Sequence, residues 1–595
     1  MKKLLQYLGN YKKESILGPL FKLLEASFEL IVPLVMAAII DTGVANADRP
    51  YIMKMSLVLF LLALIGLTCA ITAQYFAAKA AVGCATGLRH ALFEHIETLS
   101  FTEMDTVGTS TLITRMTSDV NQVQNGVNLV LRLFLRSPFI VFGAMVMAFT
   151  IDVKAALVFV VTIPLLSVVV FGIMLVSIPL YKKVQAALDK GLGITRENLT
   201  GSRVIRAFNK EQDEIAQFHE DNEALTKIQL YVGKISALMN PLTYIIINGA
   251  IVVLVWVGAI RVDNGNITQG QVVALVSYMS QILVELIKLA NLIININKSI
   301  ACMNRIETVL DMESSITEHP AAETGSLTLD GAGREGKETI PAENAVVFSR
   351  VLTYAGASEE ALSDIDFTVR RGETIGIIGG TGSGKSSVVN LIPRFYDATR
   401  GEVLVDGKNV RDYTLEELRA KVGVVLQKAV LFKGTIRENL SWGNSDATDE
   451  EMYEALETAQ AREFVDAKEG GLSYEIEQGG RNLSGGQRQR LTIARALVKK
   501  PQILIMDDSA SALDFATDAA LRKAIAHMDG QMTVFIVSQR AASIMQADKI
   551  VVLDDGEIVG LGTHEDLLKD CEVYREIYES QFKRTEEQQA GEAKR

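Results

Sequence analysis

The chain has 595 residues, of which 49% are hydrophobic, and its mean hydropathy is +0.22. Such a length predicts several domains, and such a hydropathy is high for a soluble enzyme, so we expect a membrane-embedded part. The formal net charge of −12 argues against nucleic acid as a partner, because binding to a phosphate backbone needs a basic face.

The start of the chain and its cysteines indicate neither a signal peptide nor a metal or disulfide framework. No apolar stretch follows Met1-Lys-Lys directly, since Lys12, Lys13 and Glu14 interrupt, so we expect an amphipathic helix on the membrane surface. The cysteines lie far apart without C-x-x-C spacing, which suits a reducing interior. They are Cys69, Cys84, Cys302 and Cys571.

Six apolar stretches predict an all-α transmembrane domain over residues 1–310. Three of them carry no charge and are long enough to cross a bilayer as helices: 55–78, 155–181 and 235–260. Three weaker ones complete the set: about 16–40, 128–151 and 270–297. Uncharged stretches of this length exclude a soluble enzyme.

The weaker stretches contain ionisable residues, which are costly inside a span and should face the bundle interior, an aqueous cavity or a helix end. These residues are Lys22, Glu25, Glu29, Arg132, Arg136, Glu285 and Lys288. Glu25, Arg132 and Arg136 either line a substrate path or lie near the cytoplasmic end of a helix. Glu285 and Lys288 lie one turn apart on one face and form either a structural pair or a ligand site.

Several aromatic residues and methionines could line a greasy, adaptable substrate cavity, since methionine suits promiscuous surfaces. The alternative is ordinary packing between helices or contact with lipid. The aromatic candidates are Phe134, Phe139, Tyr244 and Tyr278.

Six spans place both termini on one side, and the early lysines make that side cytoplasmic by the positive-inside rule. The inner segments, about 79–127 and 182–234, are long, polar and helix-rich. Helices of this length would extend far below the membrane and could carry force between a soluble motor and the bundle. The alternative is a pair of solvated loops.

The second half of the chain has a different character. Residues 311–345 are polar and rich in helix breakers, as in a linker. From about 346, alternating strands and helices predict an α/β domain that extends to 582. The tail, 583–595, is charged and lacks apolar periodicity, so we expect it to be loosely ordered.

The stretch Gly379-Gly-Thr-Gly-Ser-Gly-Lys-Ser386 matches the phosphate-binding loop, between an expected strand at 374–378 and an expected helix from Ser387. Backbone N–H groups of such a loop point at phosphate oxygens, Lys385 would neutralise the β/γ-phosphates, and Ser386 would ligate Mg²⁺. The candidate ATP-binding residues are Tyr354, Gly379, Thr381, Gly382, Ser383, Gly384, Lys385, Ser386, Ser387 and Gln427.

Further residues fit the same nucleotide site. Asp507 ends an apolar strand pattern and would hold Mg²⁺, and Gln427 follows another strand and could add a ligand. The expected metal ligands are Ser386, Gln427 and Asp507. Tyr354 is a candidate for stacking on adenine.

A further motif is Leu483-Ser-Gly-Gly-Gln487. Its Gly485 and Gly486 expose N–H groups at a helix start, beside the Ser484 hydroxyl, which makes a second anion-binding helix end.

The order of these motifs resembles that of half-transporters of the ATP-binding cassette (ABC) exporters, over the whole length of the chain. The motifs are Tyr354, Gly379–Ser386, Gln427, Leu483–Gln487, Asp507 and Ser511-Ala-Leu-Asp514. The resemblance implies a six-helix type I exporter transmembrane domain followed by an α/β P-loop nucleotide-binding domain that uses ATP and Mg²⁺.

The resemblance also implies that two such halves dimerise head to tail. Each ATP then lies between the phosphate loop of one chain and the signature residues of the other, here Ser484, Gly485, Gly486 and Gln487, with Asp514 in the D-loop. ATP closes the dimer and turns the bundle outward, and hydrolysis resets it. Coupling helices are expected near 103–111 and 207–217, the second docking onto the partner.

Two departures from the family pattern stand next to the γ-phosphate. A Glu normally polarises the attacking water, where this chain has Asp508. Its carboxylate would stand about 1.5 Å farther away, and about 1 Å of misplacement can cost on the order of a hundredfold in rate. A His normally contacts the γ-phosphate, where this chain has Gln539, which cannot carry a proton or a charge. Together they predict a site that binds ATP and hydrolyses it poorly.

Residues 478–487 and 508–518 also look like the degenerate chain of heterodimeric bacterial multidrug exporters. We therefore hypothesise one half of an asymmetric, ATP-driven exporter of hydrophobic or amphipathic compounds in the bacterial cytoplasmic membrane. The partner half-transporter should supply the Glu and the His, and the intact signature of this chain should complete its site. The alternatives are a slow homodimeric exporter of lipid or peptide with Asp508 as base, and an ATP-gated membrane regulator that does not pump.

Overall fold

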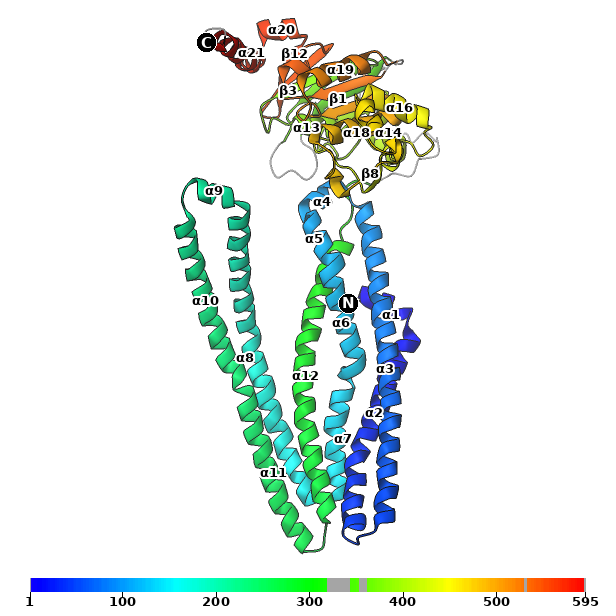
Figure 1. Cartoon of the computed structure of the whole chain (residues 1–595), viewed down its shortest axis with the longest axis vertical. Helices are drawn as coiled ribbons and strands as arrows, with labels where there is room; N and C mark the ends of the chain where they lie inside the picture. The colour runs from blue at the N-terminus through cyan, green and yellow to red at the C-terminus, as the bar shows by residue number, and fades with distance from the viewer. Residues whose placement is uncertain (1, 318–342, 353–360, 529–531, 593–595) are drawn as a thin grey trace, which may run out of the picture. The chain divides into compact units, whose positions relative to one another are not determined.

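A computed structural model of the chain contains two units (Figure 1). One comprises Met1–Glu97 and Gly108–Met312, and the other comprises Thr98–Val107 and Glu313–Arg595. The structure describes residues 2–317, 343–352, 361–528 and 532–592, with side chains from 6 to 582. The candidate adenine-stacking residue, Tyr354, lies outside the described residues.

The first unit is all-α. Its helices are α1 (Lys2–Gly9), α2 (Lys12–Ala38), α3 (Arg49–Thr98), α5 (Thr109–Thr114), α6 (Val120–Leu129), α7 (Arg136–Ile151), α8 (Val153–Thr200), α9 (Ser202–Ala207), α10 (Glu211–Ala237), α11 (Met239–Asp263) and α12 (Gln269–Leu310). Single π-helical turns interrupt them at η1 (Ile39–Val44), η2 (Arg115–Asp119) and η3 (Val130–Phe134).

Within the described residues, these elements join into six continuous helices that are long and apolar enough to cross a membrane. They are Lys12–Val44, Arg49–Thr98, Thr109–Ile151, Val153–Thr200, Glu211–Asp263 and Gln269–Leu310. Many apolar side chains on their outer faces are exposed, such as Phe60 and Trp256, which suits contact with lipid. The prediction of a six-helix transmembrane domain is confirmed.

Polar contacts hold the short connections between these helices. Asp152 caps α8 by accepting a hydrogen bond from the Ala155 N–H at 2.8 Å, and its other oxygen accepts from Arg261 at the end of α11 at 2.5 Å. Thr268 and Gln271 form a capping box at the start of α12. Because such groups satisfy the free N–H groups of a helix start, they define where each helix begins.

A cluster of charged side chains lies between α2, α7 and α12, with Arg136 and Glu285 buried at its centre. Arg136 donates to Glu285 at 2.8 Å and to Glu29 at 2.7 Å, and Ser137 donates to the second oxygen of Glu285 at 2.9 Å. Lys288 contacts the same carboxylate at 2.8 Å. The two residues that the sequence left as a structural pair or a ligand site therefore form an ion pair, within a network that joins three helices.

The second unit is an α/β domain. Its main sheet has the strand order β12-β11-β3-β10-β9-β6, parallel except for β12. These strands are β3 (Thr374–Gly379), β6 (Val422–Val425), β9 (Ile503–Asp507), β10 (Thr533–Val537), β11 (Lys549–Asp554) and β12 (Glu557–Gly562).

A second, antiparallel sheet has the order β2-β1-β4-β5. Separately, β7 (Gly434–Thr435) pairs with β8 (Glu475–Ile476). The strands of this sheet are β1 (Asn344–Val351), β2 (Ile365–Arg370), β4 (Glu402–Val405) and β5 (Lys408–Asn409).

Helices flank the sheets of this unit (Figure 1). They are α13 (Lys385–Asn390), α14 (Leu415–Lys421), α15 (Ile436–Ser441), α16 (Asp449–Thr458), α17 (Arg462–Asp466), α18 (Gly485–Val498), α19 (Phe515–Ala526), α20 (His564–Asp570) and α21 (Glu572–Glu592). Short 3-10 turns are η4 (Val410–Asp412), η5 (Gly471–Ser473), η6 (Gln478–Gly480) and η7 (Ala541–Ser543).

The main sheet is buried on both faces, which explains its continuous apolar strands. Alternate residues of β9 and β10 belong to different cores. Leu504 and Val534 pack with the helices around α18, whereas Ile505 and Phe535 pack with the antiparallel sheet. This alternation is the two-residue period of a strand, and it fixes the register in which the strand ends meet.

The helix α4 (Phe101–Val107) is inserted between α3 and α5 in the sequence but packs within the α/β unit. The ring of Phe101 lies 4.6 Å from that of Phe395, and the Tyr396 hydroxyl donates to Asp105 at 2.6 Å. Glu103 accepts hydrogen bonds from Ser100 and Ser315. Burial opposes ionisation of Glu103, but these bonds outweigh it and lower its pKa.

The short helices lie close to the expected coupling segments but not at their bounds. The first begins two residues before the expected 103–111, and α9 precedes the expected 207–217 almost entirely. Gly201 ends α8, and Asn209, in the left-handed region at φ 53°, breaks the chain before α10. An asparagine in this conformation is not evident from an otherwise amphipathic sequence.

The buried charged cluster yields a stability prediction. Replacing Glu285 with Ala leaves Arg136 buried beside a single carboxylate, and breaking such a pair costs about 3–5 kcal/mol. We expect a clear drop in the thermal unfolding midpoint of the purified chain in lipid nanodiscs. The control is Glu223→Ala on α10, whose exposed carboxylate lies 3.8 Å from Lys227 and should contribute below about 1 kcal/mol. Equal shifts in the two variants would contradict a structural role for the cluster.

Candidate functional site

The predicted phosphate loop connects β3 to α13, at the carboxyl end of a central parallel strand. Gly382 and Gly384 adopt φ angles of 87° and 89°, which side-chain-bearing residues rarely do. The Ser383 hydroxyl donates to the Gly380 carbonyl at 2.9 Å and closes the turn. The loop therefore has the strand–loop–helix setting and the tight wrap that phosphate binding requires.

Lys385 is buried and its ammonium donates to the carbonyls of Gly379, at 3.0 Å, and of Gly380. Burial lowers the pKa of Lys385, against the opposing attraction of Asp508 and Asp507. The ammonium is thus tethered over the loop whose N–H groups would face a phosphate. A bound anion would satisfy its charge, because a positive group in a partly buried site favours a negative partner.

Ser386 and Asp507 meet across the end of the sheet. The Ser386 hydroxyl donates to Asp507 Oδ1 at 2.9 Å. Burial raises the pKa of Asp507, the charge of Asp508 adds to this, and the hydrogen bond from Ser386 opposes it. A hydroxyl and a carboxylate in contact at this edge are the oxygen ligands that Mg²⁺ prefers, so these residues fit the metal that ATP carries.

Asp508 follows β9 and lies next to Gln427, which follows β6. The Gln427 amide donates to Asp508 Oδ2 at 3.3 Å, and the Asp508 backbone N–H donates to Val537 at the end of β10 at 3.0 Å. The φ angle of Asp508 is 44°, in the left-handed region. Backbone strain of this kind persists where the surrounding structure holds a residue in place, and it is common at functional sites.

Gln539 follows β10 and its side chain is exposed. Its carbonyl accepts a hydrogen bond from Gln581 of α21 at 2.8 Å. Since β10 pairs with both β3 and β9, the structure brings four predicted groups to one edge: the phosphate loop, Gln427, Asp507–Asp508 and Gln539. Parallel strands make this unavoidable, because all their carboxyl ends emerge on the same side.

The signature residues begin α18. The Ser484 hydroxyl accepts from the Gln487 N–H at 3.2 Å, and the Gln487 side chain accepts from the Ser484 N–H at 3.0 Å. This capping box leaves the first N–H groups of Gly485 and Gly486 for an external acceptor. In the described part of the chain, no hydrogen bond or ion pair joins these residues to the phosphate loop.

Sequence reasoning missed Arg540. Its guanidinium lies 3.4 Å from the carbonyls of Ala510, Ser511 and Leu513 and stacks over Phe515 at 5.1 Å. It therefore holds the segment before Asp514, whose carboxylate caps α19 by accepting from the Thr517 N–H at 2.9 Å. The only signal in the sequence was its position directly after Gln539.

The aromatic candidates for a substrate cavity separate into two groups. Tyr278 is fully buried and its hydroxyl donates to the Leu30 carbonyl at 2.5 Å, so it is a packing residue. Phe134, Phe139 and Tyr244 are exposed on helices of the membrane unit. Exposure on such a helix is compatible with lipid as well as with a substrate.

Two family models match the chain. The ABC transporter transmembrane region matches residues 15–286, and the ABC transporter model matches residues 362–511. The solved structure of a bacterial Atm1-family ABC exporter with ATP bound has the same fold, with a TM-score of 0.75 over 96% of this chain and 98% of that one, at 22% identity.

Relatives match over nearly the whole chain. An uncharacterized ABC transporter ATP-binding protein of Mycobacterium tuberculosis is 37% identical over 97% of both chains. A Bacillus subtilis protein whose name assigns it provisionally to multidrug export, as an ATP-binding/permease protein, is 33% identical over 98% of both. An ATP-dependent lipid A-core flippase of Desulfotalea psychrophila is 32% identical over 82% of this chain and 83% of that one.

The matches cover the helical unit and the α/β unit in the order in which the sequence presents them. The phosphate loop, the acidic strand end and the helix-capping signature lie in the α/β unit, and six helices of membrane-spanning length precede it. The chain therefore belongs to the ABC transporter family and is an exporter half-transporter, in which one six-helix transmembrane domain is fused to one ATP-binding domain.

Proposed function

We propose that this chain is the hydrolytically impaired half of a heterodimeric bacterial exporter. Its own site binds ATP and Mg²⁺ and turns over slowly, and its signature completes the competent site of a partner half-transporter. The observation that carries this proposal is the pair of side chains at the ends of β9 and β10, Asp508 and Gln539.

Neither side chain suits the chemistry expected at its position. The Asp508 carboxylate is one methylene shorter than that of the Glu usual in the family, and it already accepts a hydrogen bond from Gln427. Gln539 offers an amide where an imidazole would donate to the γ-phosphate. Proton transfer to a well-placed base contributes typically about 10²–10⁴ in rate, so its loss slows hydrolysis severely.

Binding of ATP uses different groups, which are all present. The loop N–H groups and Lys385 receive the phosphates, and Ser386, Asp507 and Gln427 supply oxygens for Mg²⁺. These groups lie on the strand ends and on the helix start. Gln427 donates to Asp508 through its amide nitrogen, which leaves its carbonyl oxygen for the metal. Nucleotide binding and hydrolysis are therefore separable in this site.

The signature supports a role in a second site. ABC exporters work as dimers of half-transporters, and the capping box at Ser484–Gln487 presents an intact anion-binding helix end. We propose that it closes over the partner's ATP, where the partner supplies the Glu and the His. Asp514 and Arg540 would hold the D-loop segment beside that interface.

The names of the relatives support an amphipathic or hydrophobic cargo, since one is assigned to multidrug export and another to lipid A-core flipping. We propose a transmembrane domain at 1–310, a linker at 311–345, a nucleotide-binding domain at 346–582 and a polar tail at 583–595. Both termini would be cytoplasmic, with the chain in the bacterial cytoplasmic membrane.

One observation favours a second candidate, a slow homodimeric exporter. Asp508 retains a carboxylate at the strand end, held by the Gln427 amide, so two copies of this chain would each have an acid beside the γ-phosphate and an intact signature opposite it. The two candidates differ in what the chain does alone.

The first test compares the chain alone with the pair, in nanodiscs. We expect the isolated chain to retain ATP but to release phosphate on the order of a hundredfold more slowly than the pair, because its base is misplaced. Lys385→Ala should abolish ATP retention and serves as the binding control. Brisk phosphate release by a homodimer of this chain would refute the asymmetric proposal and support the second candidate.

The second test changes one catalytic position at a time within the pair. Asp508→Glu should alter total ATP turnover less than about twofold, because Gln539 still lacks an imidazole. Replacing the partner's catalytic Glu with Gln should lower turnover at least about a hundredfold, since it removes the only competent base. Turnover that survives in the partner variant would show that Asp508 acts as a working base.

A third prediction concerns the aromatic contact of α4. Phe101→Ala removes a ring contact worth about 0.5–1.5 kcal/mol, so we expect about a two- to tenfold loss of cargo-stimulated ATP turnover, with basal ATP binding unchanged. Phe93→Ala on the exposed face of α3 is the matched control. Unchanged stimulation in Phe101→Ala would argue against coupling through this contact.

A further inference from the structure

A cavity of about 710 Å³ lies at the edge of the main sheet opposite the phosphate loop. Ile503 and Thr533, the first residues of β9 and β10, line it, whereas Asp507 and the phosphate loop lie at the other ends of their strands. Pockets that hold drug-sized ligands measure about 300–1,000 Å³. The cavity is thus large enough for a small molecule and distinct from the nucleotide site.

Three helices of the α/β unit end at this cavity. Thr458 is the last residue of α16, Val498 is the last of α18, and Ala524 lies in the last turn of α19. The carboxyl end of a helix carries about half a negative charge from its unpaired carbonyls. Three such ends around one cavity favour a positively charged group.

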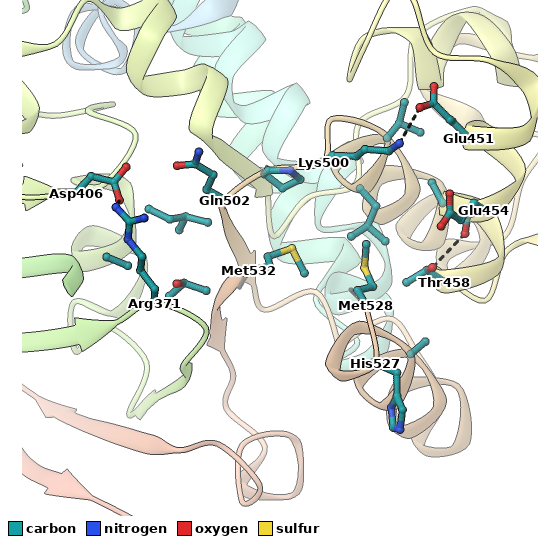
Figure 2. Close-up of a pocket in the computed structure, with 18 residues that line it drawn as sticks. Arg371, Asp406, Glu451, Glu454, Thr458, Lys500, Gln502, His527, Met528 and Met532 are labelled. Atoms are coloured by element: carbon teal, nitrogen blue, oxygen red, sulfur yellow. Dashed lines mark hydrogen bonds and ion pairs between the residues drawn. The ribbon is translucent and has the colours of Figure 1, made fainter. Parts of the chain in front are cut away.

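The charged side chains on the helix side add to this preference. Glu451 pairs with Lys500 at 2.7 Å, and Glu454, one turn along α16, adds a second carboxylate (Figure 2). Glu454 forms no ion pair within the described residues. Glu451, Glu454 and Lys500 together therefore give this wall a net charge of −1.

The opposite wall is formed by the antiparallel sheet and has the reverse polarity. Arg371 pairs with Asp406 at 2.9 Å (Figure 2). Lys421, at the end of α14 and outside the cavity lining, pairs with the other oxygen of Asp406 at 2.6 Å. Two cations thus share one carboxylate there. An ammonium group would settle at the helix wall and a carboxylate would not.

Between the two walls, the lining is apolar. Met528 and Met532 lie in the middle of the cavity and both pack against the core around α18 (Figure 2). Methionine side chains are flexible and polarisable, so they adapt to apolar bodies of different shapes. The cavity therefore combines a negative end with an adjustable apolar middle.

We propose that this cavity is a binding site for a small amphipathic monocation, with its apolar body on Met528 and Met532 and its ammonium group near Glu454 and the ends of α16 and α18. The site lies wholly within the α/β unit. It does not depend on whether the partner is a second copy or a different half-transporter.

Occupancy of this site would act on the signature through α18. This helix starts at the signature residue Gly485 and ends at Val498 in the cavity wall, about 20 Å apart at about 1.5 Å per residue. A helix is stiff along its axis, so a ligand that bridges its carboxyl end to the sheet would restrict its amino end as well. The cavity would thereby regulate how the signature closes over the partner's ATP.

The test uses three probes of similar size on the full-length chain in nanodiscs: phenylbutylammonium, phenylbutanol and phenylbutyrate. Hydrogen exchange measured by mass spectrometry reports on residues 449–458 and 497–503 at the cavity and on 484–490 at the signature. We expect protection at the cavity in the order ammonium, alcohol, carboxylate, and ammonium-dependent protection at the signature. Probe bound to the membrane helices does not affect these peptides directly.

Two pairs of variants locate the site. Glu454→Gln should raise the apparent Kd of phenylbutylammonium about three- to fivefold, in line with a partly exposed charge pair. Glu457→Gln should not, because the Glu457 carboxylate pairs with Arg462 of α17 outside the cavity lining. Ala524→Leu fills the cavity and should abolish protection, whereas Ala526→Leu adds the same volume on the exposed side of α19.

Several results would overturn the proposal. Equal protection by all three probes, no protection by phenylbutylammonium, or protection that survives Ala524→Leu would each refute the binding site. Protection at the cavity without any change at 484–490 would refute the regulatory link through α18.

Discussion

The hydrogen-bonded register of the parallel sheet is the constraint on which this domain depends. Val537 of β10 lies opposite Ile377 of β3 on one side and Asp507 of β9 on the other. The strands are buried on both faces, so their register cannot slip without exposing apolar side chains. The phosphate loop, the acidic residues after β9 and the glutamines after β6 and β10 therefore meet at one edge.

In the function that we propose, this shared edge would allow ATP binding to persist where hydrolysis fails. Binding relies on backbone N–H groups, Lys385 and the contact between Ser386 and Asp507, which follow from the loop and the strand ends. In the proposed function, hydrolysis would rely on the length and proton chemistry of the two side chains at 508 and 539. We propose that the change of one methylene at 508 and of one ring at 539 leaves the fold and the phosphate-binding groups intact and impairs only the hydrolytic step.

Because the strands run parallel, the two edges of the sheet also have opposite electrostatic character. Helices that follow the strands begin near the carboxyl edge, where their amino ends attract phosphate. At the amino edge, α16, α18 and α19 end beside Glu454 and Met528, and their carbonyl ends attract a cation. α18 is the element that reaches from this cavity to the signature, so it connects the domain's own interior to the surface that a partner's nucleotide would meet.

Much of this protein could be predicted from its sequence because the decisive patterns are local. Six long apolar stretches specify six membrane helices, since a bilayer tolerates little else, and a loop of glycines followed by Lys385 and Ser386 behind an apolar strand specifies a phosphate site. The types of residue at 508 and 539 are likewise read directly from the chain. The boundaries of α9 were less accessible, because Asn209 breaks the helix by its backbone conformation and its surroundings.

The tertiary structure alone decided which distant residues meet. Glu285 is held by Arg136, 149 residues away, as well as by Lys288, and Tyr278 is buried against Leu30 rather than exposed to a cavity. Arg540 contacts the D-loop carbonyls, and α4 packs its Phe101 on Phe395 of the α/β unit. The cavity at the amino edge gathers residues from all parts of this domain. The sequence determined the chemistry of each group through its local pattern, whereas these contacts arise only when helices and strands pack, because packing joins side chains that no local period relates.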